Sequence, residues 1–158
     1  MNLPENANGI TGSIRYVDSA DVNKSNLLPA GTTIFPKRGG SILTNKKRLT
    51  TRIICADLNI MGVTPKTCLL PEFLFYYFLG VDMRKINNGS SIPQINNYSI
   101  EPLLISFPTS LPEQQQIVTV LESLSAETQR LASLYERKLA ALEALKKSLL
   151  HQAFSGEL

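Results

Sequence analysis

Six basic residues between positions 37 and 52 are the side chains in this sequence best suited to bind a ligand, and the ligand they suit is a polyanion. They are Lys37, Arg38, Lys46, Lys47, Arg48 and Arg52. The sixteen-residue stretch that holds them contains no Asp or Glu. Such a run favours contact with phosphates, although charge runs are often solvated surface loops. Both interpretations remain open from the charges alone.

Two polar, glycine-containing stretches could add hydrogen bonds to the same ligand. Gly39 and Gly40 follow Arg38 and permit close approach of the backbone. The pattern of a nucleotide-binding P-loop is absent. The turn segment at 87–94 supplies Ser90, Ser91 and Gln94 as weaker candidates for contact with a base or a phosphate.

No catalytic or metal-binding constellation stands out. The chain has one histidine, His151, and two cysteines, Cys55 and Cys68, without metal-ligand spacing around them. There is no nucleophile elbow, no H-E-x-x-H and no Asn/Asp-Pro-Pro-aromatic tetrapeptide. No feature of the sequence singles out a pair of Asp or Glu residues as a catalytic pair. The sequence therefore predicts a non-enzymatic binding module, with no cofactor of its own and with reduced cysteines, as in a cytoplasmic protein. The polar start carries no signal peptide, and no apolar run is long enough to span a membrane.

The elements that must position these residues are short strands, loops and one apolar helix. The patterns predict strands at 14–17, 32–35, 42–44 and 52–61, and a buried strand at 103–107. Residues 71–79 predict a helix, with Pro71 and Glu72 at its start and Gly80 at its stop. This helix is apolar nearly all round, which favours a core helix over a surface for stacking bases.

The last third of the chain predicts one long helix with a coiled-coil seam. Pro112 and Glu113 suit a helix start, and Gly156 is the next helix stop. Apolar residues recur at heptad spacing from Leu121 onwards. The predicted interface residues are Leu121, Leu124, Leu131, Tyr135, Leu142, Leu145 and Leu149. One helix cannot bury its own stripe, so we expect a partner helix, in preference to packing on the domain itself.

The fold class predicted is therefore α+β, with a mixed strand and loop domain at 1–110 followed by the helical region at 111–158. Residues 1–112 hold eleven Lys and Arg against seven Asp and Glu, whereas residues 113–158 hold five against six. The positive charge therefore concentrates on the first region, where the polyanion would bind.

Four motifs in order carry a resemblance to a known family. Residues 111–118, Leu-Pro-Glu-Gln-Gln-Gln-Ile-Val, and residues 153–158, Ala-Phe-Ser-Gly-Glu-Leu, resemble the start and end of the conserved helix in specificity subunits of type I restriction–modification systems. Residues 28–40 resemble the family's strand and loop. Residues 89–96, followed by Pro-Leu-Leu-Ile at 102–105, resemble another of its segments. The resemblance spans about residues 14 to 158.

The resemblance implies a function and partners. Such subunits are non-catalytic and bind double-stranded DNA, each target recognition domain reading one half of a split site. Their helices form an antiparallel coiled coil that measures the gap between the halves. They dock methyltransferase subunits, and the complex recruits a restriction subunit. S-adenosylmethionine, ATP and Mg are accordingly expected only on the partner subunits.

Two departures from the family pattern leave alternatives open. Full-length members carry two recognition domains and two helices, whereas this chain shows the motifs of one of each. Because the family usually has several dozen more residues before the segment that matches Ile14, we expect the recognition domain to lack the family's usual first strands. The helix would then pair with a copy of itself or with a second half subunit. The competing hypothesis is a truncated subunit that acts only as a coiled-coil docking module and binds no DNA. The third hypothesis is a regulator or a fragment of an enzyme, and no catalytic motif in the sequence supports it.

Overall fold

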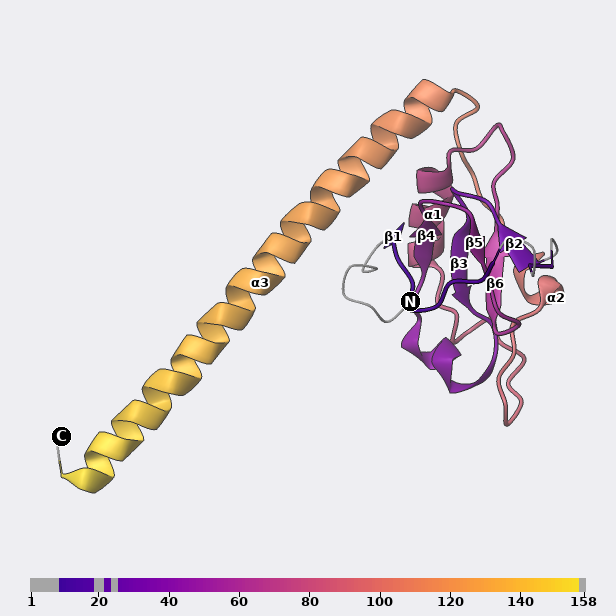
Figure 1. The fold of residues 1–158 in the computed structure, drawn as a ribbon. Coiled ribbons are helices and arrows are strands. Elements are labelled where there is room, and N and C mark those ends of the chain that lie inside the picture. The colour runs from indigo at the N-terminus through magenta and orange to yellow at the C-terminus, as the bar shows by residue number, and fades with distance from the viewer. Residues whose placement is uncertain (1–8, 19–21, 24–25, 157–158) are drawn as a thin grey trace. The chain divides into compact units, whose positions relative to one another are not determined.

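The computed structural model describes residues 9–18, 22–23 and 26–156, and it is an α+β fold as predicted (Figure 1). Contacts divide the chain into two compact units, Met1–Val118 and Thr119–Leu158. The long helix α3 begins at Leu111 and contributes to both. The strands are β1 (Gly9–Ile10), β2 (Leu27–Leu28), β3 (Thr33–Pro36), β4 (Arg48–Thr50), β5 (Ile54–Cys55) and β6 (Ile60–Val63). The helices are the 3-10 helix η4 (Gly39–Thr44), α1 (Pro71–Gly80), α2 (Asn97–Ile100) and α3 (Leu111–Ser155).

The larger sheet has the strand order β1-β4-β3-β6, so β3 lies inside it. β3 runs antiparallel to β4 and β6, and Thr33 pairs with Leu49 on one side and Val63 on the other. β1 pairs with β4 in parallel. A second, two-stranded sheet joins β2 and β5. The strand predicted at 32–35 is thus confirmed as the buried central strand.

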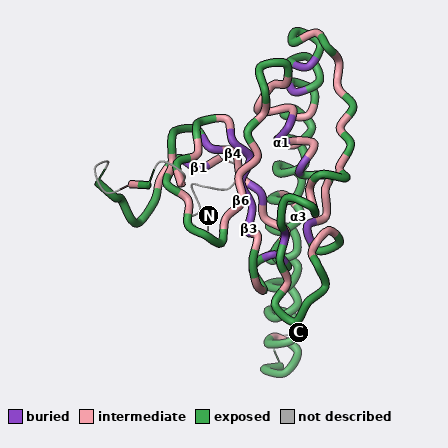
Figure 2. Tube along the Cα trace, turned by 90° about the vertical axis from the view of Figure 1, so that its right-hand side faces the viewer, coloured by how far each residue is buried: buried purple, intermediate pink, exposed green. Residues whose placement is uncertain are grey.

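Alternate residues of β3 face opposite sides of the sheet, because side chains in a strand alternate. Phe35 is fully buried and packs toward α1, where its ring lies 5.6 Å from that of Phe78. Leu74 joins the same cluster. Figure 2 shows buried positions along both β3 and α1. The prediction that the apolar helix at 71–79 is a core helix is confirmed.

Three of the predicted strands are wrong. Residues 14–17 are exposed and make no strand. Ile42 is buried as expected, but residues 42–44 lie in η4, between Gly39 and Asn45, both of which have positive φ. Residues 103–107 are extended without a strand partner, since a proline lies at each side and Leu104 is 90% exposed. Of these apolar residues Ile42 is buried, whereas Ile14 and Leu104 are exposed, so the apolar pattern predicted neither pairing nor burial reliably.

The predicted strand at 52–61 is two strands, β5 and the start of β6. Asp57 interrupts the run, because its carboxylate accepts a hydrogen bond from the backbone N–H of Asn59 at 2.6 Å. Such a side-chain turn competes with strand pairing. β5 and β6 consequently belong to different sheets.

The long helix is confirmed, with its end where Gly156 adopts a φ of +75°. Its first turns contain its two buried residues, Gln114 and Val118. No helix in the described ranges combines the length and apolar character needed to cross a membrane.

Candidate nucleic-acid interface

Two loops that are far apart in the sequence meet next to β3. Arg38 and Gln94 form an isolated antiparallel bridge. The Gly39 N–H donates to the Pro93 carbonyl at 2.8 Å, and the Ile95 N–H donates to the Lys37 carbonyl at 2.9 Å. The structure therefore joins the two motifs at Lys37, Arg38 and Gln94, and Ser90 and Ser91 lie in the same loop as Gln94. We call Lys37, Arg38, Ser90, Ser91 and Gln94 the paired-loop surface.

The second of these loops is closed by its own asparagines. The Asn88 carboxamide oxygen accepts from the Gln94 N–H at 3.0 Å, and the Asn88 N–H donates to the Gln94 carbonyl at 3.0 Å. Gly89 takes a φ of +66°, which a side chain would oppose. The Ser90 hydroxyl lies 2.6 Å from the Ile92 carbonyl. Ser90 therefore shapes the loop.

Arg38 and Gln94 are the members of the paired-loop surface whose side chains are available to a ligand. Both are exposed, whereas Lys37 is half-buried. The Arg38 guanidinium makes no ion pair or hydrogen bond within the described ranges. A guanidinium presents two parallel N–H donors to guanine, and a glutamine amide matches adenine. Ser91 is exposed as well.

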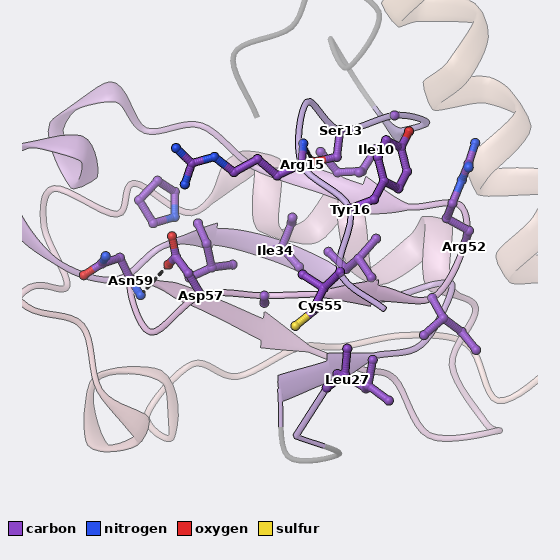
Figure 3. Close-up of a pocket in the computed structure, with 18 of the residues that line it drawn as sticks. Ile10, Ser13, Arg15, Tyr16, Leu27, Ile34, Arg52, Cys55, Asp57 and Asn59 are labelled. Carbon is purple, nitrogen blue, oxygen red and sulfur yellow. Dashed lines mark hydrogen bonds between the residues drawn. The ribbon is translucent and has the colours of Figure 1, made fainter. Parts of the chain in front are cut away.

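Lys46 and Arg52 line a pocket of about 830 Å³. This pocket is on the face of the sheet that carries Ile34, opposite to Phe35. Figure 3 shows Arg15 and Arg52 on opposite sides of the view, with Tyr16 between them, and all three line the pocket. The sequence pattern did not single out Arg15 or Tyr16, because they lie outside the basic stretch. The lining of the pocket comes largely from residues 10–17 and 52–60, which lie far apart in the sequence.

Lys47 corrects the prediction of a continuous basic surface. Its side chain is only 2% exposed, and its ammonium donates to the Asn45 carboxamide oxygen at 2.8 Å and to the Val81 carbonyl at 2.6 Å. Burial lowers the pKa of the Lys47 ammonium, and nearby Asp82 opposes that shift. Lys47 therefore holds η4 to the segment after α1 and does not belong to the interface.

Arg48 is also withdrawn from the surface in part. It is half-buried, and its guanidinium donates to the carbonyl of Lys47 at 2.6 Å, while burial lowers its pKa. The six predicted cations thus separate into three pairs. Lys37 and Arg38 lie on the paired-loop surface, Lys46 and Arg52 line the pocket, and Lys47 and Arg48 are drawn into the fold.

The buried Lys47 predicts a pH dependence of stability. Since its pKa is below the usual 10.5 in the folded chain, the unfolded chain binds an extra proton between the two values. Stability from this group therefore rises as pH increases through that window, by at most about 1.4 kcal/mol per pH unit. Lys47→Met should remove the rise, measured as the difference in unfolding free energy from the unsubstituted chain. Lys46→Met is the control, and a pH-independent difference for Lys47→Met would contradict the assignment.

All seven predicted interface residues of the long helix belong to the second compact unit. Leu121 is half-buried, whereas Leu124, Leu131, Tyr135, Leu142, Leu145 and Leu149 are exposed. Leu142, for example, is 61% exposed. An exposed stripe of this length at heptad spacing is what a partner helix would cover.

Within the described residues, no group of three His, Cys, Asp or Glu side chains could hold a metal ion. Cys55 and Cys68 are free and exposed.

We compared the chain with known proteins, by sequence and by structure. No curated protein matches the chain. A solved structure described as "Structural basis underlying complex assembly and conformational transition of the type I R-M system" is similar, with a TM-score of 0.71 and 20% identity. The similarity covers 84% of this chain and 33% of that one, so this chain spans about a third of its length. A family model described as "Type I restriction modification DNA specificity domain" matches residues 5–138. The chain therefore belongs to the family of type I restriction–modification DNA specificity domains.

Proposed function

We propose that this chain is a non-catalytic DNA-reading subunit of a type I restriction–modification complex and directs methyltransferase and restriction subunits to one half of a bipartite target. The observation that carries the proposal is the paired-loop surface in a chain of this family. Two motifs place Arg38, whose guanidinium has no partner among the described residues, beside the exposed Gln94. Both side chains can read base edges in the major groove.

The remaining cations would have supporting roles in this interface. Lys37 lies beside Arg38 and would hold a phosphate, which positions the protein without reading sequence. Lys46 and Arg52 line the pocket on the neighbouring sheet face and would extend the positive surface along the backbone. Methyl transfer would occur on the partner subunits, which would hold S-adenosylmethionine, ATP and Mg. The complex would act in the cytoplasm.

For the helix we propose antiparallel pairing with a second copy of this chain or with a second half subunit. Charge along α3 supports that direction. Residues 113–134 hold three acids and one base, whereas residues 135–151 hold four bases and two acids. An antiparallel partner of the same sequence would set the acidic half against the basic half, which favours this pairing. The same helices would dock the methyltransferase.

A second candidate function is helical docking without DNA binding. The exposed leucine stripe favours it, because that stripe is available irrespective of the recognition domain. Expression of the chain with a cognate methyltransferase subunit, followed by sequencing of methylated adenines, separates the two candidates. A split methylated motif supports the DNA-reading function. Absence of a motif, with the methyltransferase still co-purifying, supports the docking function alone.

The paired-loop surface gives a direct prediction for DNA binding. Lys37→Ala should reduce the slope of log K for DNA binding against log salt concentration by about 0.9, because one phosphate is no longer neutralised. The reduction should be equal on all DNA sequences. Arg38→Ala should reduce discrimination against a changed guanine by about 1–3 kcal/mol. Binding would be measured by titration at several salt concentrations, on the methylated motif and on single-base variants of it.

The control for both variants is Lys66→Ala, since Lys66 is exposed but outside both loops. Its salt slope should shift less than that of Lys37→Ala, and its base discrimination should equal that of the unsubstituted chain. Unchanged discrimination in Arg38→Ala would remove the paired-loop surface from the proposed reading of sequence.

A further inference from the structure

Gln114 is fully buried in the first unit, and its side-chain amide makes three hydrogen bonds to the backbone. Its carboxamide oxygen accepts from the Leu70 N–H at 2.8 Å. Its amide nitrogen donates to the Cys68 carbonyl at 2.9 Å and to the Pro108 carbonyl at 2.7 Å. One side chain therefore joins three segments of the chain, namely the start of α3 and the two loops that lead into α1 and α3.

Among the described residues, the three backbone groups that Gln114 binds have no second hydrogen-bond partner. Leu70 is the N-cap residue of α1 and has no side chain that could cap that helix. The first N–H groups of a helix need acceptors from outside it. Gln114 supplies one such acceptor. Removing one partner of a buried hydrogen bond leaves the other unsatisfied, which is costly.

The first turns of α3 consequently behave as part of the recognition domain. Val118 follows Gln114 by one helical turn and is also fully buried. Gln116, in the same turn as Gln114, is exposed. The division between the compact units falls after Val118, although α3 itself continues to Ser155.

We propose that Gln114 is a positioning residue that locks the start of the spacer helix to the recognition domain and thereby sets the gap between the two halves of the DNA target. The proposal rests on the proposed function for its DNA part only. A helix is stiff over a few turns. If the first turns of α3 are held in place, the direction in which the helix leaves the domain is held as well. Without the three hydrogen bonds, the start of α3 would be held mainly by the packing of Val118, and we expect the direction of the helix to vary more.

The first test measures this direction without DNA. Cys55 is spin-labelled together with a label on Lys147→Cys, in a Cys68→Ser background and diluted with unlabelled chain, and pulsed EPR records the distance distribution. Gln114→Met keeps side-chain length and helix propensity but removes all three hydrogen bonds. We expect the width of the distribution to roughly double in this variant. Gln116→Met, with the same change at an exposed position, should leave it unchanged.

Each outcome of this test bears on the proposal. An unchanged width in folded Gln114→Met, or equal broadening in Gln116→Met, would overturn it. A loss of thermal stability without broadening would show a merely structural role and would also overturn it. If Gln114→Met does not fold, Gln114→Glu takes its place, because a carboxylate still accepts from the Leu70 N–H but cannot donate to either carbonyl. We then expect intermediate broadening.

The second test reads the gap in the methylated motif. With the unsubstituted chain a single gap length is expected, and with Gln114→Met additional gaps that differ by a base pair or more. A single, unchanged gap in Gln114→Met would overturn the proposal. If the unsubstituted chain yields no motif, the proposed function fails, whereas the role of Gln114 is still decided by the EPR widths.

Discussion

Replacing Phe35 by alanine should lower the free energy of unfolding by about 3–5 kcal/mol, since this ring is fully buried at the centre of the core. The ring packs against Phe78 of α1, and its removal leaves a cavity between the sheet and that helix. The sheet and α1 together position both loops of the paired-loop surface. Chemical denaturation, followed by circular dichroism, would measure the change.

The chain offers a matched control for this variant. Phe154 is 88% exposed in the last turns of α3, so Phe154→Ala should change the unfolding free energy by no more than about 0.5 kcal/mol. An effect of Phe35→Ala as small as that of Phe154→Ala would contradict the packing of β3 against α1. In Phe35→Ala we also expect weaker DNA binding, as the fraction of folded chain falls.

Replacing Leu142 by glutamate should weaken helix pairing at least about a hundredfold, because a carboxylate would be buried in an apolar seam without a partner. Leu142 lies at a heptad core position and is exposed in the single chain. The measurement is molecular mass in solution across a range of concentrations, by analytical ultracentrifugation. The recognition domain should stay folded, since Leu142 lies in the other compact unit.

Ala144→Glu is the control for the helix variant. It adds the same charge two residues further along, on the polar face of the heptad pattern. Pairing should survive in Ala144→Glu. If Leu142→Glu had the same mass as the unsubstituted chain, the predicted seam would not be the pairing surface.

The elements that the sequence predicted well are those governed by local chemistry. Helix α1 begins at Pro71 and ends at Gly80, as its boundary residues indicated. Helix α3 ends before Gly156 because glycine readily takes the left-handed conformation found there. β3 was evident from its β-branched and aromatic residues. In each case neighbouring residues carry the information.

The predictions that failed required knowledge of a distant partner. Leu104 lies in an apolar run, yet no described strand pairs with that run. The Tyr77 hydroxyl donates to the Leu104 carbonyl at 3.1 Å. The basic stretch looked like one surface, but the Val81 carbonyl, thirty-four residues away, draws Lys47 inside. Nothing near Lys47 in the sequence signals that contact.

By itself the sequence determined the family, the α+β class and the long helix, and it supplied the set of residues from which an interface could be drawn. The coiled-coil seam stays a prediction. These follow from residue type and spacing, which act over one or two helical turns or along one strand. Only the tertiary structure decided which cations share a surface. Backbone bonds between residues 37–39 and 93–95 unite Arg38 with Gln94, and Gln114 joins α3 to the loop before α1. Such contacts depend on how distant segments pack. Buried backbone N–H and C=O groups need hydrogen-bond partners, and which groups become buried is determined only in the folded chain.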